Sequence, residues 1–392
     1  MVDSKDGPIL AAFQKRFQRQ PEHIFFSPGR VNLIGEHIDY NGGKVMPCAI
    51  SLGTYLAVSK NTDKKFRFHC LNFPETAELH LQNSYSKSGW AWFNYPLGII
   101  NYFITQGHSI SGLDMLFYGD LPIGAGLSSS ASIEVLTAFT LKELFQLNVP
   151  QIEIATLSKK VENEFIGVNC GIMDQFAVTF GQKNKAIMLN CDTLEYELLP
   201  FQTDDYALTI INTNKTRTLA DSKYNERFAE CGAALKALKK EIVANNLCDI
   251  GIETFKSARH LINDDVLQKR ALHVISENSR VNDAKAALNE RNLKRFGELM
   301  YASHQSLKDL YEVSGIELDT IVDFCKSYEH CVGARMTGAG FGGCAIALVK
   351  TDKVNDFAEK LSSYYKSKIG YDPTVFASAI GDGVRELQPS SV

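Results

Sequence analysis

Short β-rich runs, in which apolar residues are frequent, dominate the first 70 residues of the chain. Residues 23–35, 44–60 and 64–70 have this character, and turn-forming residues separate them, which favours β-strands. Residues 1–20 instead mix apolar with basic positions, as in a short amphipathic helix. We therefore expect one helix followed by a mainly β opening.

Helical spacing of apolar residues begins further along the chain. It occurs in residues 129–146 and again in residues 151–166, and the second run opens directly after Pro150. Both runs follow a loop that is rich in glycine and serine. This order predicts two consecutive helices after the loop.

The second half of the chain mixes both patterns. The strand-like runs are residues 186–201, 206–214, 344–349 and 374–380, and the helical runs are residues 225–243 and 279–307. A polar stretch between Phe201 and Tyr206 marks a plausible crossing between domains. The expected fold class is α+β, with domains at residues 1–204 and 205–392.

Composition narrows the class of protein. A chain of 392 residues exceeds the size at which a single core usually stops growing, which supports two domains. The net charge is -4 and no long basic run occurs, so we expect no nucleic-acid partner.

The cysteines form no C-x-x-C pair and the first residues form no continuous apolar stretch. We therefore expect reduced thiols, no membrane anchor and a cytoplasmic location.

The loop PIGAGLSSSAS, residues 122–132, lies directly before the first helical run of the central region. Backbone N–H groups at a helix start bind anions, and glycines let a chain wrap closely around a phosphate. The plainer interpretation is an ordinary glycine turn with a serine N-cap. Since G-x-x-x-x-G-K-[ST] is absent from the chain, a nucleotide site here would belong to a fold other than the P-loop.

A second glycine loop, TGAGFGG, occupies residues 337–343, where Gly338, Gly340 and Gly343 match the spacing G-x-G-x-x-G. A dinucleotide-binding fingerprint must run from a strand into a helix, whereas residues 344–349 are apolar and β-prone. This argues against a Rossmann site. Two interpretations remain, a tight hairpin that only shapes the fold or a backbone wall beside a ligand.

Four ionisable residues crowd into one glycine-rich turn near the start of the chain, namely Arg30, Glu36, His37 and Asp39. Carboxylates and imidazole bind sugar hydroxyls, and an arginine neutralises phosphate oxygens. Taken singly, each residue is more often a solvated surface charge. His37 and His69 have no partner at metal-ligand spacing, which argues against zinc.

Together these three loops, in their order along the chain, resemble those of the GHMP kinase superfamily. The segment GRVNLIGEHIDYNGG at residues 29–43 resembles the galactokinase signature nearly position for position, and GIMDQF (171–176) and SKYNER (222–227) match as well. The resemblance implies a two-domain fold with a mixed β-sheet and helices in each domain and the active site in the cleft between them. It also implies transfer of the ATP γ-phosphate to the anomeric C1 hydroxyl of α-D-galactose.

The resemblance also assigns roles at the matching positions. Asp174 matches the general base, and Arg30 matches the residue that assists it and stabilises the transition state. The residues that would contact the sugar are Glu36, His37, Ile38, Asp39 and Tyr224. The residues that would wrap the ATP phosphates are Gly124, Ala125, Gly126, Leu127, Ser128, Ser129 and Ser130.

The cofactor that the resemblance implies is Mg²⁺, bound together with ATP. Ser130 and Glu162 match the positions that hold this ion in the family. The family's ATP site also tends to include a serine near the end of the early β-rich region. Cys70 stands near that place in this chain, which is a departure from the family pattern.

The chemistry fits these residue types, because phosphoryl transfer needs mainly alignment and charge neutralisation, and a carboxylate can accept the proton of a hemiacetal hydroxyl. Each residue also has a plainer interpretation. Asp174 precedes an apolar run and could cap a helix. Glu162 could be one of several neighbouring charges on its helix, and Tyr224 could be a half-buried aromatic residue. The resemblance favours the functional interpretation of all three.

Two alternative functions stay open. The first is a GHMP kinase for another small alcohol, such as N-acetylgalactosamine, mevalonate or homoserine, but the Glu-His-x-Asp cluster and the glycines of residues 41–43 favour galactose. The second is a catalytically silent sensor of galactose and ATP, but Ser130, Ala131 and Asp174 are retained, which favours turnover. No heptad seam occurs, so we expect a monomer.

Overall fold

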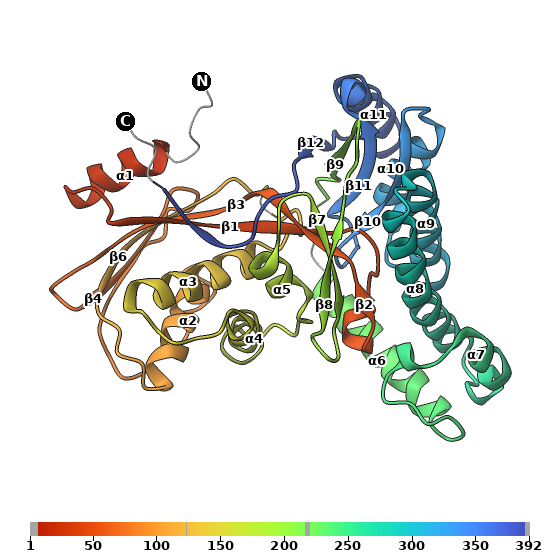
Figure 1. Ribbon diagram of the computed structural model, residues 1–392, viewed down its shortest axis with the longest axis horizontal. Coiled ribbons are helices and arrows are strands. Elements are labelled where there is room, and N and C mark those ends of the chain that lie inside the picture. Colours follow the sequence, from red (N-terminus) through yellow and green to blue (C-terminus); the bar gives the residue numbers. More distant parts are fainter. Residues whose placement is uncertain (1–6, 123, 216–219, 389–392) are drawn as a thin grey trace.

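The computed structural model describes residues 7–122, 124–215 and 220–388. Within these residues the strands form three sheets. Figure 1 shows the sheet of β1, β3, β4 and β6 on one side of the molecule and the strands β9 to β12 with helices α8 to α11 on the other. The two parts meet at the ends of β1 and β10, where the backbone N–H of Asn32 donates to the hydroxyl of Thr337 at 3.0 Å.

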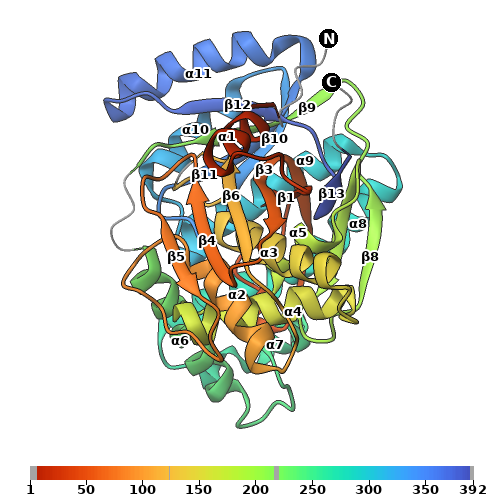
Figure 2. The same cartoon turned by 90° about the vertical axis from the view of Figure 1, so that its left-hand side faces the viewer.

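The first sheet has six strands in the order β13-β1-β3-β6-β4-β5, which can be followed in Figure 2. Neighbours are antiparallel except for β4 and β6. The strands are β1 (His23–Asn32), β3 (Pro47–Lys60), β4 (Lys65–Cys70), β5 (Ala77–His80), β6 (Leu113–Gly119) and β13 (Arg385–Leu387). Since β13 pairs with β1, the end of the described chain joins the sheet that its beginning builds.

Helices cover both faces of this sheet (Figure 1). Those on one face are α2 (Asn94–Thr105), α3 (Ser129–Phe145), α4 (Gln151–Val161) and α5 (Met173–Phe180). They enclose a core that includes Phe66 and Phe103. Helix α1 (Gly7–Phe17) covers the other face, where its buried Ile9 and Phe13 pack with Phe26. Successive strand residues thus face two different cores, so β1 and β3 are buried along nearly their whole length.

The other two sheets are built mainly from the middle and end of the chain, together with the short strand β2 from its early part. One has the order β10-β11-β9-β12 and the other the order β2-β7-β8. Their strands are β2 (Lys44–Val45), β7 (Lys185–Asn190), β8 (Tyr196–Pro200), β9 (Tyr206–Asn212), β10 (Cys331–Thr337), β11 (Cys344–Lys350) and β12 (Thr374–Ser378). The helices of this part are α6 (Ala220–Leu238), α7 (Ile252–Ala258), α8 (Asp265–Asn289), α9 (Leu293–Ser306), α10 (Gly315–Ser327) and α11 (Val354–Ile369).

The α+β class and the two central helices are confirmed, the helices as α3 and α4. The helical run of residues 279–307 is divided between α8 and α9. The break occurs because Arg291 has a left-handed φ of 54° and the side chain of Asn292 accepts from Arg295 N at 3.0 Å, which caps α9. The boundary between residues 204 and 205 stays a prediction. No helix in the described ranges is long and apolar enough to span a membrane.

Two glycines let α9 lie directly on β10. A Cβ atom at Gly333 would overlap the backbone of Gly297 on α9, and a Cβ atom at Gly297 would overlap the carbonyl of Val332. Strand β10 leads into the glycine loop of residues 337–343. The close approach of helix and strand therefore fixes where that loop begins.

The substitution Gly333→Ala should lower the free energy of unfolding by about 1 to 3 kcal/mol, because the added methyl group has no space between α9 and β10. The matched control is Gly232→Ala on α6, where a Cβ atom would meet no atom within 4 Å. This control should be neutral or stabilising by up to about 1 kcal/mol. Urea denaturation of both variants measures the difference, and equal effects would contradict the packing argument.

Candidate active site

A bidentate ion pair joins β1 to the first turn of α5. Arg30 Nε and Nη2 lie 2.7 and 2.6 Å from the two carboxylate oxygens of Asp174. The Arg30 side chain is buried, whereas that of Asp174 keeps 29% of its surface exposed. The N-cap of α5 is Ile172, so Asp174 does not cap this helix. The pair therefore presents a carboxylate that is held by an arginine and still accessible.

The same pair holds the glycine- and serine-rich loop. Arg30 Nη1 donates to the carbonyl of Gly126 at 2.9 Å, and the Ser128 hydroxyl donates to Asp174 Oδ2 at 2.6 Å. Gly126 and Ser128 have left-handed φ values of 75° and 63°. Helix α3 begins at Ser129, and its first backbone N–H groups have no partner within the helix. The loop thus brings an anion-binding helix start beside the Arg30–Asp174 pair.

The predicted ATP residues take different positions in this loop. The side chains of Ala125 and Leu127 are buried in the core, so only their backbone can face a ligand. Gly124, Ser129 and Ser130 instead line a cavity of about 200 Å³. Its wall also includes Cys70 and the aromatic residues Phe73, Trp92, Tyr95 and Phe117. Cys70 therefore lies beside the loop, in the wall of a largely apolar cavity.

Glu162 begins the π-helical turn Glu162–Ile166 that follows α4, and it is buried. Its carboxyl accepts hydrogen bonds from Gln175 Nε2 at 2.6 Å and from the Ser130 hydroxyl. Burial raises its pKa, and the bond from Ser130 opposes that shift. Glu162 is thus not a solvated surface charge. A hydroxyl and a carboxylate oxygen fit Mg²⁺, which takes few protein ligands and keeps sites for water and phosphate.

Sequence reasoning missed a second carboxyl beside Glu162. Glu134 lies on α3, is fully buried and interacts with both Glu162 and Gln175. Burial, and then the negative charge of Glu162, raise the pKa of Glu134 well above its ordinary value. The sequence carries no signal for this contact, because Glu134 stands alone within an apolar helical run.

The residues of the early turn line a second cavity, of about 340 Å³. Its lining includes Arg30, Glu36, His37, Asp39, Asp174 and Tyr224. Ile38 lies between them in sequence, but its side chain is fully buried in the core and does not line the cavity. Trp90, which the sequence analysis did not single out, lines the cavity and is 91% exposed.

The side chain of Glu36 is almost fully buried and is bonded to the second part of the chain. Arg335 Nη1, which is fully buried on β10, lies 3.3 Å from Glu36 Oε2, and the backbone N–H of Gly338 donates to Glu36 Oε1. Burial raises the pKa of Glu36, and Arg335 opposes that shift. Removal of Glu36 would leave the positive charge of Arg335 buried without its carboxylate partner. Variants at Asp39 therefore probe the cavity more cleanly than variants at Glu36.

Asp39 faces Gly171, and a Cβ atom at that glycine would overlap the Asp39 carboxylate. This contact explains the glycine in GIMDQF. Burial, and then the negative charges of Asp174 and Glu36, raise the pKa of Asp39 from 3.8 to about 7. The lining thus includes three carboxyl groups and the guanidinium group of Arg30, which suits a ligand with several hydroxyl groups.

Comparison with known families identifies the class of protein. The family model for the GHMP kinases N terminal domain matches residues 94–182. The model for the GHMP kinases C terminal region matches residues 284–367. A mevalonate kinase from Methanococcus jannaschii, 21% identical, has the same fold, with a TM-score of 0.68 over 92% of this chain and 99% of that chain. Fold and site together define a GHMP kinase.

More similar proteins narrow the class. The galactokinase galactose-binding signature matches residues 11–60. The galactokinase of Staphylococcus carnosus is 50% identical over 97% of this chain and 99% of its own. A Lactococcus lactis galactokinase solved with galactose is 45% identical, with a TM-score of 0.94 over 98% of this chain and 100% of that chain. The chain belongs to the galactokinase family.

The raised pKa of Asp39 predicts a pH dependence of stability. The folded chain holds the Asp39 proton up to about pH 7, whereas the unfolded chain releases it near pH 3.8. This carboxyl therefore favours the folded state below about pH 4, and that contribution is lost as the pH rises to 7. The variant Asp39→Asn, which cannot ionise, should gain stability relative to the wild type between pH 5 and pH 8.

Thermal unfolding of both proteins at these two pH values measures the effect. The control is Asp283→Asn, which changes an exposed aspartate on α8. A difference between wild type and Asp39→Asn that stays constant with pH, or that shrinks as pH rises, would show that folding does not raise the pKa of the Asp39 carboxyl.

Proposed function

We propose that the protein transfers the γ-phosphoryl group of ATP to the anomeric C1 hydroxyl of α-D-galactose and releases galactose 1-phosphate and ADP. The observation that carries this proposal is the Arg30–Asp174 pair. It lines the cavity of the early turn and is hydrogen-bonded to the phosphate loop through Gly126 and Ser128. A proton acceptor for the sugar and an anion-binding helix start therefore lie side by side.

The sugar is assigned to the cavity of Glu36, Asp39 and Tyr224. Carboxylates accept hydrogen bonds from sugar hydroxyls, and the Tyr224 ring adds an apolar face. The Tyr224 ring centroid lies 5.7 Å from that of His37, so both belong to the same wall. Ile38 would contribute only its backbone.

In the proposed step, Asp174 accepts the proton of the C1 hydroxyl, and the sugar oxygen bonds to the γ-phosphorus. The bond between that phosphorus and the bridging oxygen breaks, and the electron pair leaves with ADP. Arg30 orients the carboxylate and places a positive charge beside the loop, where negative charge develops on the transferred group.

Ser130 and Glu162 would hold Mg²⁺, which when bound neutralises charge on the ATP phosphates. The nucleotide base is assigned to the apolar cavity beside the loop, which Cys70 helps to line. A monomeric state and a cytoplasmic location stay predictions.

ADP release by the purified protein with Mg-ATP tests the function, with galactose, N-acetylgalactosamine, glucose, mevalonate and homoserine offered in parallel. Turnover highest with galactose is the expected result. Turnover highest with another alcohol would support a kinase activity but identify a different acceptor. Binding of galactose and ATP with no turnover on any of the five would identify a sensor.

The variant Asp174→Asn tests the base. Turnover should fall by about 10² to 10⁴, because a positioned base contributes a factor of this size. Binding of galactose and ATP, measured by calorimetry, should remain within about threefold of the wild type, since an amide keeps the shape of the side chain. Asp283→Asn serves as the control. A kcat close to that of the wild type would remove Asp174 from the role of base.

The variant Cys70→Phe tests the place of the nucleotide base. The phenyl ring should fill the cavity and raise the KM for ATP by about tenfold or more, which corresponds to about 1.4 kcal/mol. The control Cys70→Ser preserves the volume and should change this KM by less than about threefold. An unchanged ATP KM in Cys70→Phe would place the base elsewhere.

A further inference from the structure

The ring of His37 is buried and uses both of its nitrogens within the protein. Nε2 lies 3.1 Å from the carbonyl oxygen of Ala339, and Nδ1 lies 2.8 Å from the hydroxyl of Tyr40. A carbonyl can only accept, so Nε2 carries the proton and Nδ1 accepts from Tyr40. Burial lowers the pKa of His37 to about 3, which keeps the ring neutral. Each nitrogen therefore has one fixed role.

This assignment fixes the direction of a longer chain of hydrogen bonds. Because the Tyr40 hydroxyl donates to His37, it accepts from the hydroxyl of Tyr311, 2.8 Å away. The Tyr311 hydroxyl in turn accepts from the thiol of Cys231 at 3.1 Å. Burial raises the pKa of that thiol to about 11, so it retains its proton. Each group along the path from Cys231 to His37 therefore donates its proton to the next group.

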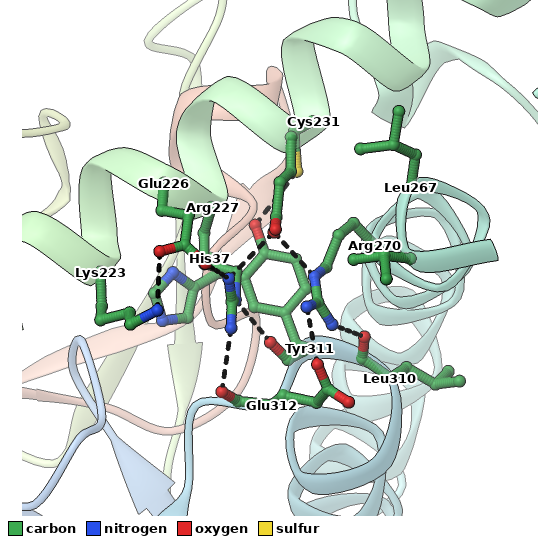
Figure 3. Close-up of polar contacts among 12 residues, drawn as sticks. His37, Lys223, Glu226, Arg227, Cys231, Leu267, Arg270, Leu310, Tyr311 and Glu312 are labelled. Carbon is green, nitrogen blue, oxygen red and sulfur yellow. Dashed lines mark hydrogen bonds and ion pairs between the residues drawn. The ribbon is translucent and has the colours of Figure 1, made fainter. Parts of the chain in front are cut away.

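Tyr311 is held in place by two buried arginines, as Figure 3 shows. It ends the π-helical turn Leu307–Tyr311, where carbonyl groups have no helical partner. Arg227 Nε donates to the carbonyl of Tyr311 at 2.7 Å, and Arg270 Nη1 donates to the carbonyl of Leu310 at 2.6 Å. Both arginines also bond to Glu230, at 3.0 and 2.8 Å. The two guanidinium groups thus clamp the end of this turn.

The clamp connects directly to the proposed sugar site. Arg227 lies on α6 less than one turn after Tyr224, which lines the cavity. The Tyr311 ring packs on His37 with a centroid distance of 4.9 Å, yet Tyr311 itself does not line the cavity. His37 holds Ala339, and the preceding Gly338 donates its N–H to Glu36. One network therefore ties three walls of the cavity together.

We propose that Tyr311 is a positioning residue for the sugar. Through Tyr40 its hydroxyl fixes the orientation of His37, and His37 sets the glycine loop against Glu36. This inference rests on the proposed function, since the proposed function assigns the cavity to galactose. Tyr311 does not line the cavity assigned to the sugar, so it acts only through other residues.

The variant Tyr311→Phe preserves the ring packing and removes only the hydroxyl. Loss of the donor to Tyr40 should raise the KM for galactose by about 5- to 30-fold, while kcat and the KM for ATP stay within about twofold. The matched control is Tyr301→Phe on α9, whose hydroxyl donates to Cys331 at 3.6 Å outside this network. A response equal to that of Tyr301→Phe, or equal changes in both KM values, would overturn the proposal.

A double-mutant cycle separates a relay from two independent contacts. Tyr40→Phe removes the donor to His37 directly, so adding Tyr311→Phe to it should raise the galactose KM no further. Additive effects of the two substitutions would overturn the proposal.

Nitrogen-15 spectra of histidine-labelled protein provide a readout that needs no turnover. The wild type should show His37 as the Nε2–H tautomer, and the Nδ1 shift should move in Tyr311→Phe toward that of a nitrogen without a hydrogen bond. An unchanged His37 spectrum would overturn the proposal. Wild-type protein that does not phosphorylate galactose would instead refute the proposed function, and the spectra would still test the network.

Discussion

The buried contact between Glu36 and Arg335 determines where the two parts of the chain meet. Glu36 follows β1, Arg335 lies on β10, and 299 positions separate them in sequence. Charges removed from water carry a large desolvation penalty, so each depends on its partner to remain buried. The turn after β1 and the glycine loop after β10 are therefore held together, and the cavity between them acquires a fixed shape.

Around this contact the site contains two kinds of polar group. His37 and Glu36 are buried and bonded within the protein, so they hold walls in place. Asp174 is paired with Arg30 and yet 29% exposed, so it can meet a ligand. The difference in exposure separates residues that shape the cavity from Asp174, the residue that we propose as the base. Arg227 and Arg270 also belong to the first kind of group, because they are buried and bonded within the protein.

Contiguous segments were the most predictable from the sequence. Helices α3 and α4 follow their apolar period, and the turn of Glu36, His37 and Asp39 forms one side of the cavity as a unit. Isolated residues were not predictable. Arg335 and Glu134 stand alone in apolar runs, and Tyr311 has no motif around it. Periodicity reports which face of an element is buried, but it does not report which distant residue lies opposite.

The sequence by itself determined the family resemblance, the main helices and strands, and the short loops whose residues carry the chemistry, because each is encoded within a few consecutive positions. Only the tertiary structure decided that Arg30 meets Asp174 across 144 positions, that Glu162 is buried against Gln175, and that Ile38 faces the core. Hydrogen bonds and ion pairs between distant segments depend on how sheets and helices pack, and packing is a property of the whole chain.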